Sequence, residues 1–294
     1  MKITDLIGNT PTIELDTVNG NKIFAKLEYF NPTGSIKDRA AYYMVKEAIA
    51  RGDVKVGGEV VEATSGNTGI GLAMVCRAYG IRCTIVMPEN MSRERIDMIR
   101  AYGANIVLTD KAFGMKGAVE KAEAMCRESG AFMARQFDNR DNIKAHIETT
   151  APEIFRDTPS VQWIVSPVGS GGTATGVKRY IVDNGIDAKV CAVEPTASPL
   201  MTKGVAGPHK IQGIGANFVP SIVDPSVFDE ILCVSDDEAY EGARRLARDF
   251  GVFAGISSGA SYMAGLRLAE RVHGDILIII PDSGARYMSV GLYE

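Results

Sequence analysis

Short apolar runs alternate with segments of helical periodicity along almost the whole chain, and this alternation limits its fold more than any other feature. The runs 60–63, 83–87 and 105–108 are each followed by a segment in which apolar residues recur every three or four positions. A buried strand followed by an amphipathic helix is typical of parallel sheets with crossover helices. The same alternation of strands and helices recurs in the second half, from the run 162–165 to the run 275–280. We therefore predict an α/β protein.

We expect two lobes, each with a mostly parallel, twisted sheet flanked by helices, and a ligand in the cleft between them. The smaller, mobile N-terminal lobe is expected at 35–137 and the larger C-terminal lobe at 138–294, with part of 9–34 joining them. A length of 294 residues is enough for two cores of this size. In the smaller lobe we expect a helix at 35–50 with Ser35 as its N-cap.

Composition excludes several classes of function. The net charge of −4 gives no general attraction to nucleic acid or to an anionic membrane. The five cysteines form no C-x-x-C pair and the three histidines are scattered, so we expect no metal site. The longest apolar run, 276–280, is too short to cross a bilayer, and the N-terminus lacks the apolar core of a secretion signal. We therefore expect a cytoplasmic protein.

One polar turn presents a candidate reactive amine. The segment Asn31-Pro32-Thr33-Gly34-Ser35-Ile36-Lys37-Asp38-Arg39 places Lys37 at the start of a helix. The positive end of the helix dipole and the nearby Arg39 both disfavour the ammonium form, so they favour a lysine that acts as an amine and a base. A solvated surface lysine is the alternative at this position.

Two further turns offer anion sites. Thr64-Ser65-Gly66-Asn67-Thr68-Gly69 opens a helix, so its hydroxyl and N–H groups suit a carboxylate; helix capping is the alternative. Gly169-Ser170-Gly171-Gly172-Thr173 has the same context, and its glycines let the backbone wrap a phosphate; a tight turn is the alternative. A reactive amine, a carboxylate site and a phosphate cradle together indicate an aldehyde cofactor that carries a phosphate, pyridoxal 5'-phosphate.

A dinucleotide is the rival ligand. Gly169-x-Gly171-x-x-Ala174 matches a short dinucleotide fingerprint, and Glu194 ends the next strand, where an acid that binds ribose is expected. This pattern predicts an NAD-binding dehydrogenase. It accounts for neither Lys37 nor the turn at Asn67.

Three more segments extend the candidate site. Asp282 and Ser283 follow the last strand, where α/β folds bind ligands, and either could contact the ring nitrogen of the cofactor. Gly255–Ala260 opens a helix and is a candidate wall of a substrate pocket, with helix capping as the alternative. The stretch 195–229 shows little periodicity, and a loop of that length is usually functional.

Together these segments closely resemble the cysteine synthase (O-acetylserine sulfhydrylase) family, in the tryptophan-synthase-β group (fold type II) of pyridoxal-phosphate enzymes. The resemblance runs nearly from end to end. Its motifs are Ile7–Pro11, Asn31–Arg39, Glu62–Gly69, Met87–Pro88 with Met91–Ser92, Gly114–Ala118, Gln136–Phe137, Thr149–Ile154, Gln212–Ala216, Gly255–Ala260 and Ser283–Tyr287. The chain departs from the family at Ala151, where glycine is usual, and at Ala285, where an acidic residue is common.

The resemblance implies a role for each candidate residue. Lys37 is expected to be the catalytic residue and to hold the cofactor as a Schiff base. Asn67 is expected at the ring hydroxyl and Ser283 at the ring nitrogen, which decides between Ser283 and Asp282. The phosphate is expected on Gly169, Ser170, Gly171, Gly172 and Thr173. The α-carboxylate of the substrate is expected on Thr64, Ser65, Thr68 and Gln136.

The implied reaction is a β-replacement that forms L-cysteine from O-acetyl-L-serine and sulfide through an α-aminoacrylate. Alternatives use O-phosphoserine, serine or cysteine and yield cystathionine or sulfide; a catalytically silent regulator is another. We expect a homodimer, with serine acetyltransferase as a candidate partner, and closure of the lobe around 83–127 on substrate.

The leaving group is judged from the long loop. Within 195–220 the cations are Lys203 and Lys210, beside His209, and there is no arginine. A phosphate leaving group is best bound by a bidentate arginine, whereas an acetyl group requires no cation. This favours O-acetylserine over O-phosphoserine.

Overall fold

The computed structural model describes all 294 residues, and the chain divides into two compact units. Unit 1 consists of Met1–Ile7 and Lys37–Asn142, and unit 2 consists of Gly8–Ile36 and Ile143–Glu294. Residues 8–36, part of which we expect to join the lobes, are counted with unit 2. No helix is both long and apolar enough to span a membrane.

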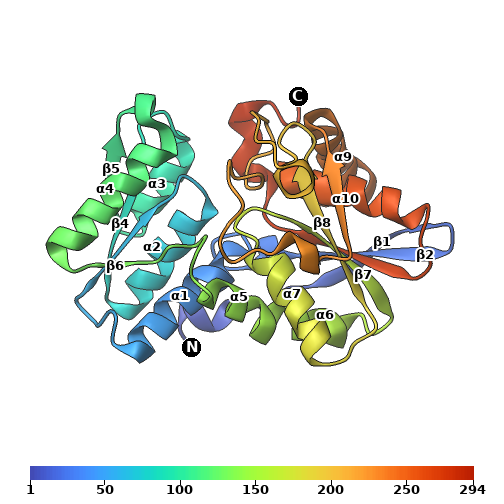
Figure 1. Ribbon diagram of the computed structural model, residues 1–294, viewed down its shortest axis with the longest axis horizontal. Coiled ribbons are helices and arrows are strands. Elements are labelled where there is room, and N and C mark those ends of the chain that lie inside the picture. Colours follow the sequence, from blue (N-terminus) through green and yellow to red (C-terminus); the bar gives the residue numbers. More distant parts are fainter. The chain divides into compact units, whose positions relative to one another are not determined.

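Unit 1 is built on a parallel sheet of four strands in the order β5-β4-β3-β6 (Figure 1). Val60 packs with residues of the first two helices, whereas its neighbour Val61 packs with the fourth, so helices cover both faces of the sheet. The elements are η1 (Ile3–Leu6), α1 (Lys37–Arg51), β3 (Glu59–Ala63), α2 (Asn67–Tyr79), β4 (Arg82–Pro88), α3 (Arg93–Ala101), β5 (Asn105–Thr109), η3 (Lys111–Phe113), α4 (Gly114–Ser129) and β6 (Phe132–Met133).

Unit 2 is built on a sheet of six strands in the order β1-β2-β10-β7-β8-β9, in which only β1 is antiparallel to its neighbour. Its strands are β1 (Thr12–Val18), β2 (Asn21–Leu27), β7 (Val161–Pro167), β8 (Lys189–Pro195), β9 (Glu230–Val234) and β10 (Asp275–Ile280). Its helices are η2 (Glu28–Phe30), α6 (Ala151–Asp157), α7 (Gly172–Asp183), α8 (Leu200–Lys203), η5 (Pro225–Val227), α9 (Asp236–Phe250), α10 (Ile256–Ala269) and η6 (Gly284–Val290). Helix α5 (Asp141–Ala145) and the π-helical turn η4 (His146–Thr150) precede α6.

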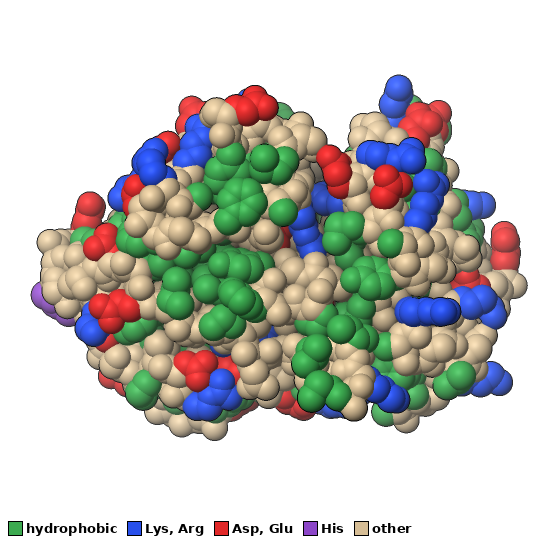
Figure 2. Space-filling view, turned by 180° about the vertical axis from the view of Figure 1, so that it is seen from behind, with side chains coloured by type: hydrophobic (Ala, Val, Ile, Leu, Met, Phe, Trp, Pro, Cys, Tyr) green, Lys and Arg blue, Asp and Glu red, His purple; other side chains and the backbone are tan.

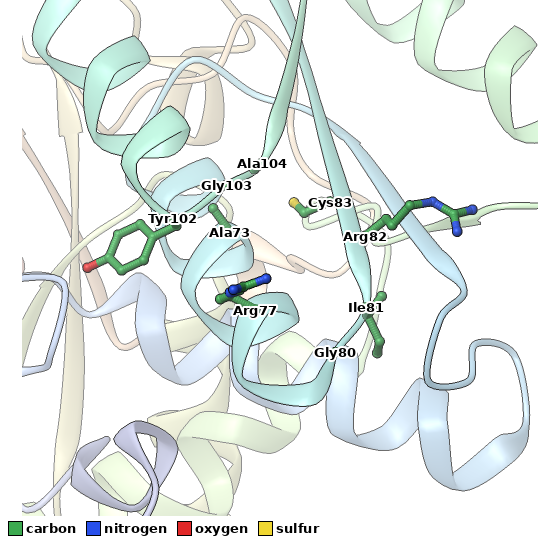
Figure 3. A pocket seen from close by; sticks show the side chains of 9 residues that line it. All are labelled: Ala73, Arg77, Gly80, Ile81, Arg82, Cys83, Tyr102, Gly103 and Ala104. Carbon is green, nitrogen blue, oxygen red and sulfur yellow. The ribbon is translucent and has the colours of Figure 1, made fainter.

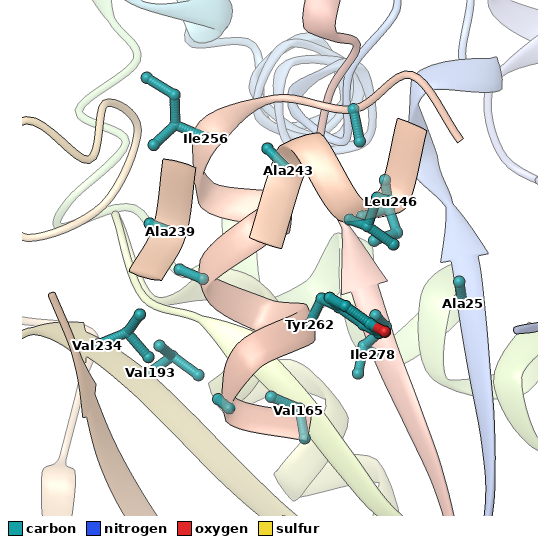
Figure 4. Packing of buried hydrophobic residues seen from close by; sticks show 14 of the residues in the cluster. Ala25, Val165, Val193, Val234, Ala239, Ala243, Leu246, Ile256, Tyr262 and Ile278 are labelled. Atoms are coloured by element: carbon teal, nitrogen blue, oxygen red, sulfur yellow. The ribbon is translucent and has the colours of Figure 1, made fainter. Parts of the chain in front are cut away.

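The last strand explains the longest apolar run of the sequence, because both of its faces are buried. Ile276, Ile278 and Ile280 pack with the residues of α9 and α10 (Figure 4). Leu277 and Ile279 pack on the opposite side with residues of α6 and α7. A parallel strand buried on both faces reads as a continuous hydrophobic run.

Local signals fix several helix ends. Ser235 and Glu238 form a capping box at the start of α9, and Gly251 ends that helix with a φ of 68°. Gly80 ends α2 with a φ of 66°. A side chain is strained at such angles, so glycine is the usual residue there.

The structure departs from the sequence prediction at three places. Helix α1 begins at Lys37, two residues later than expected, and Ser35 is fully buried and forms an antiparallel bridge with Asp282. Strand β1 was not expected, because a register shift between Glu14 and Asp16 interrupts its alternation. The π-helical turn η4 was also not expected.

Candidate active site

Lys37 follows a segment that is paired with the end of the last strand. The N–H of Ile36 donates to the carbonyl of Pro281 at 2.8 Å, and Ser35 bridges to Asp282. Lys37 is partly exposed between the buried residues Ile36 and Asp38. Lys37 therefore directly follows a segment that is paired at the carboxyl end of β10, and parallel α/β sheets bind ligands at the carboxyl ends of their strands.

A buried polar network anchors the segment that leads to Lys37. The Nζ of Lys26 is 3.0 Å from Oε2 of Glu153 and donates to the carbonyl of Thr10 at 2.9 Å. The hydroxyl of Thr10 donates to Glu28 at 2.7 Å, and the amide of Asn31 donates to the same carboxylate at 2.9 Å. These contacts give a structural reason for the motifs Ile7–Pro11 and Asn31–Pro32.

The glycine-rich turn of unit 2 has the geometry of an anion cradle. Gly171 has a φ of 82° and precedes α7, whose first turn is capped by no side chain. A Cβ on Gly171 would lie 2.0 Å from Cγ2 of Val223, and a Cβ on Gly169 would lie 2.3 Å from the carbonyl oxygen of Gly213. Backbone N–H groups at a helix start without a side-chain cap suit a phosphate, so the residues present fit the phosphate of pyridoxal phosphate.

His146 joins this turn through a contact that the sequence alone does not indicate. The Nε2 of His146 lies 3.2 Å from the hydroxyl oxygen of Thr173, and its Nδ1 lies 2.9 Å from that of Thr150. His146 and Thr173 are both buried. The π-helical turn η4 presents His146 to α7, and π-helical turns are frequent at functional sites.

The two candidates after β10 have different surroundings. Asp282 is buried, and its Oδ2 accepts a hydrogen bond from the hydroxyl of Tyr287 at 2.6 Å. Ser283 is partly exposed, and its Oγ accepts from the N–H of Ala285 at 3.3 Å. The carboxylate of Asp282 therefore has a structural role, whereas the hydroxyl of Ser283 can reach a ligand.

The structure gives a reason for glycine at position 255, at the start of α10. A Cβ on Gly255 would lie 2.1 Å from Oδ1 of Asp282, so only glycine fits there. Ser258, one turn into α10, is completely buried and has no hydrogen-bond partner for its Oγ. A side chain without exposed surface does not line a substrate pocket in this conformation.

The four predicted carboxylate-binding residues of unit 1 lie in one region. The hydroxyl of Thr68 donates to Oε1 of Gln136 at 2.6 Å, and Nε2 of Gln136 donates to the hydroxyl oxygen of Thr64 at 3.4 Å. Ser65 is partly exposed, and so is Asn67, the first residue of α2. Gly66, the residue before α2, provides no side-chain cap, so the helix start is open to an anion.

Two charged residues of this region were not predicted from the sequence. The guanidinium of Arg95, on α3, donates to the carbonyl of Ser65 at 3.3 Å. Glu62 is buried behind the turn, and its carboxylate accepts from the N–H groups of Arg135 at 2.7 Å and of Gln136 at 3.2 Å. Burial raises the pKa of Glu62 to about 7, while the two N–H donors oppose the rise. Glu62 lies inside one of the family motifs, but an acid in an apolar strand gives no sign of its partner.

The dinucleotide interpretation fails at Glu194. Its Oε2 accepts from the N–H of Met201 at 2.8 Å, and its Oε1 accepts from the N–H of Thr202 at 3.1 Å. Glu194 is buried, so its carboxylate caps α8 and is not presented to a ribose.

A cavity of about 180 Å³ in unit 1 lies at the amino ends of the strands, opposite to the candidate substrate turn (Figure 3). Arg77, Arg82 and Cys83 are among its lining residues, where α2 ends and β4 begins. Ligands of parallel sheets bind at the carboxyl ends of the strands, and Thr64 follows that end of β3. This cavity is therefore separate from the candidate site.

Comparison with known proteins gives concordant results. The model of the family described as pyridoxal-phosphate dependent enzyme matches residues 3–282. A cysteine synthase of Staphylococcus aureus is 42% identical over 299 residues, covering 99% of this chain and 96% of that protein. A solved cysteine synthase of Entamoeba histolytica is 42% identical with a TM-score of 0.96, covering 99% of this chain and 90% of the other. An O-ureido-L-serine synthase is 41% identical with the same TM-score, covering 99% and 94%.

Proposed function

Because the chain belongs to the cysteine synthase family of pyridoxal-phosphate dependent enzymes, we propose that it forms L-cysteine from O-acetyl-L-serine and sulfide by β-replacement. The observation that carries the proposal is the cluster of Thr64, Thr68 and Gln136. Its hydroxyl and amide groups, next to the open start of α2, can bind the α-carboxylate of an amino acid. An amino-acid substrate is therefore matched by residues of this chain.

The remaining candidate residues divide the other tasks. Pyridoxal phosphate supplies an electron sink for carbanion chemistry when it is bound. The turn 169–173 would hold its phosphate, Asn67 its ring hydroxyl and Ser283 its ring nitrogen. Lys37 would bind its aldehyde until the amino group of the substrate takes its place there, and the freed Nζ of Lys37 would then take the proton from the α-carbon of the substrate. Loss of the acetate and addition of sulfide at the β-carbon complete the replacement.

The test of Lys37 is chemical. Borohydride reduction followed by peptide mapping should place the pyridoxyl group on Lys37, and Lys37→Ala should lose turnover by at least about a thousandfold. Lys46, which lies on the same helix and is exposed at 43% of its side chain, provides the matched control, and Lys46→Ala should retain turnover. A label on another lysine, or normal turnover of Lys37→Ala, contradicts the assignment.

The choice of acetate as the leaving group depends on which cations the long loop carries. Lys203 and Lys210 are exposed, and the loop 195–220 contains no arginine. Arg95 is the arginine found at the substrate turn, and its guanidinium contacts the backbone of Ser65. The test is the ratio of kcat/KM for O-acetyl-L-serine to that for O-phospho-L-serine at fixed ionic strength. If the phosphate ester is preferred, and Lys203→Ala or Lys210→Ala removes the preference, the acetyl assignment is wrong.

A second candidate product is O-ureido-L-serine. The solved O-ureido-L-serine synthase is as similar to this chain as the solved cysteine synthase is. An oxygen nucleophile would then replace sulfide in the second half of the reaction. The test supplies O-acetyl-L-serine together with equal concentrations of sulfide and hydroxyurea. Mass spectrometry then shows whether L-cysteine or O-ureido-L-serine is the main product.

The assembly and compartment are also proposals. Figure 2 shows hydrophobic side chains gathered on the larger unit, at the left of that view. The exposed large hydrophobic residues of unit 2 include Phe30, Phe218, Phe253 and Met288, which supports a homodimer; light scattering after gel filtration tests it. All five cysteines are free, which supports the reducing cytoplasm. Serine acetyltransferase remains a candidate partner, to be tested by co-purification of the two proteins.

A further inference from the structure

Strand β6 has two residues, and the second residue after it, Arg135, is left-handed although it is not glycine. Arg135 has a φ of 52°, and the other non-glycine residues with positive φ are Asn9 and Asn19. Asparagine tolerates this conformation, but a longer side chain disfavours it by about 1–2 kcal/mol. The conformation of Arg135 therefore requires an external contact.

The carboxylate of Glu62 provides that contact. Its two oxygens accept separately from the N–H groups of Arg135 and Gln136, at the point where the β3–β6 ladder has ended. Only 2% of Glu62 is exposed. Two asparagine side chains bond to the carbonyls on either side of Arg135 in the chain: Asn139 donates to the carbonyl of Ala134 at 3.0 Å, and Asn142 donates to that of Gln136 at 2.8 Å.

The turn determines where the amide of Gln136 points. With its backbone held by Glu62, the side chain of Gln136 contacts both Thr68 and Thr64. Glu62 and Thr64 are two residues apart on one extended segment, so they face the same side of the sheet. The side chain of Arg135 lies elsewhere, 3.1 Å from Glu123 on α4. The turn therefore depends on the backbone of Arg135.

We infer that Glu62 is a positioning residue for amino-acid recognition: it imposes the left-handed turn at Arg135 and thereby orients Gln136 toward the α-carboxylate of the substrate. The inference rests on the proposed function, in which Gln136 contacts that carboxylate. Glu62 does not touch the substrate itself.

The main variant is Glu62→Gln in the holoenzyme, assayed at pH 8, above the pKa of about 7 of Glu62, so that the wild-type side chain is a carboxylate. The new NH₂ group faces a backbone N–H, so one of the two hydrogen bonds is lost. We expect KM for O-acetyl-L-serine to rise by about tenfold or more while kcat changes by less than about threefold, because a carboxylate contact is present in the ground state and the transition state alike. The matched control is Glu59→Gln, on the same strand, where the carboxylate accepts from Thr84; its KM should stay within about twofold of wild type.

Binding without turnover gives a second readout. L-Alanine carries the α-carboxylate but has no β-leaving group, so its dissociation constant can be measured by calorimetry. We expect it to rise in Glu62→Gln and in Gln136→Ala alike. If Gln136→Ala binds L-alanine normally, the carboxylate site itself is misassigned. If only Gln136→Ala is impaired, the inference about Glu62 is wrong.

Two changes at Arg135 test the turn without altering Glu62. Both remove the contact with Glu123, but valine resists a positive φ and asparagine accepts it. Arg135→Val should therefore have a KM at least about fivefold above that of Arg135→Asn. In the Glu62→Gln background, Arg135→Gly should recover part of the lost affinity. Equal KM values for the two Arg135 variants would refute the inference, even if Glu62→Gln failed to fold.

Discussion

Replacing Lys26 by methionine should strongly destabilise unit 2. The ammonium group is completely buried, 3.0 Å from Oε2 of Glu153 and 3.7 Å from Oδ2 of Asp157. The side chain of Glu153 is 7% exposed, and its other oxygen accepts a hydrogen bond from the N–H of Asn9 at 2.9 Å. Methionine fills a similar volume but leaves a buried carboxylate without the ammonium that faces it.

The magnitude follows from the charge left behind. Breaking a buried ion pair by removing one partner costs about 3–5 kcal/mol, and the carbonyl of Thr10 loses its donor as well. We expect a loss of about 4 kcal/mol in the free energy of unfolding. Removing both charges in Lys26→Met/Glu153→Gln should recover at least about 2 kcal/mol of it, because no unpaired charge is then buried.

The assay can report on unit 2 alone, because the single tryptophan of the chain, Trp163, lies on β7. Its fluorescence during urea denaturation follows the unit that contains Lys26. The control is Lys22→Met on the same strand: Lys22 and Glu14 form an ion pair at 2.9 Å, but both side chains are about half exposed. That variant should lose less than about 1 kcal/mol. If Lys26→Met loses no more free energy of unfolding than Lys22→Met does, or if the double variant is no more stable than Lys26→Met alone, the argument fails.

Three further predictions concern the site. Gly169→Ala should raise the dissociation constant of pyridoxal phosphate by at least about tenfold, because its Cβ would displace the carbonyl of Gly213; unchanged affinity, measured by dialysis, contradicts the cradle. Asp282→Asn should lower the thermal stability of unit 2 through the contact with Tyr287, whereas Ser283→Ala should lower kcat with little loss of stability; the reverse pattern exchanges their roles. The pKa of Glu62 is raised from 4.5 to about 7, so the folded protein holds this proton more tightly than the unfolded chain. Folding therefore favours the protonated form of Glu62, and this favourable contribution, present below pH 4.5, is lost as the pH rises through about 7, a change on the order of 3 kcal/mol. The cost of ionisation is desolvation, which the two N–H donors to the carboxylate offset only in part. Hydrogen exchange of the β3 amides should show that wild type loses stability relative to Glu62→Gln between pH 5 and 8, and the opposite trend would contradict this.

The sequence predicts features whose causes are local. The alternation of strands and helices and the glycine turn before α7 both follow from residues next to one another in the chain. Each needs a backbone angle or a periodicity that the residue type itself favours. The fold class can therefore be predicted from the amino-acid sequence.

The features that were mispredicted or missed depend on distant partners. Helix α1 was expected to begin at Ser35, but the segment of Ser35 pairs with Asp282 near the other end of the chain. His146 is one of three scattered histidines in the sequence, and only the folded chain brings it beside Thr173. Glu62 gave no signal because its partners, the N–H groups of the 135–136 turn, carry no side-chain identity. Grouping Gln136 with Thr64 required the family resemblance, since no local pattern links them.

The place of β10 in the sheet has a consequence for synthesis of the chain. Its amino end lies beside β2, where the N–H of Lys22 donates to Asp275, 253 residues away. At about 5–20 residues per second, a ribosome takes roughly 10–50 seconds to travel that distance. Once β7 has been made, the strands of unit 1 are complete, whereas β2 and β7 each lack the neighbour that separates them in the finished sheet until β10 follows. The nascent chain therefore carries two exposed apolar strand edges until its last few residues emerge, and this is the period in which it is most open to aggregation and to chaperone binding.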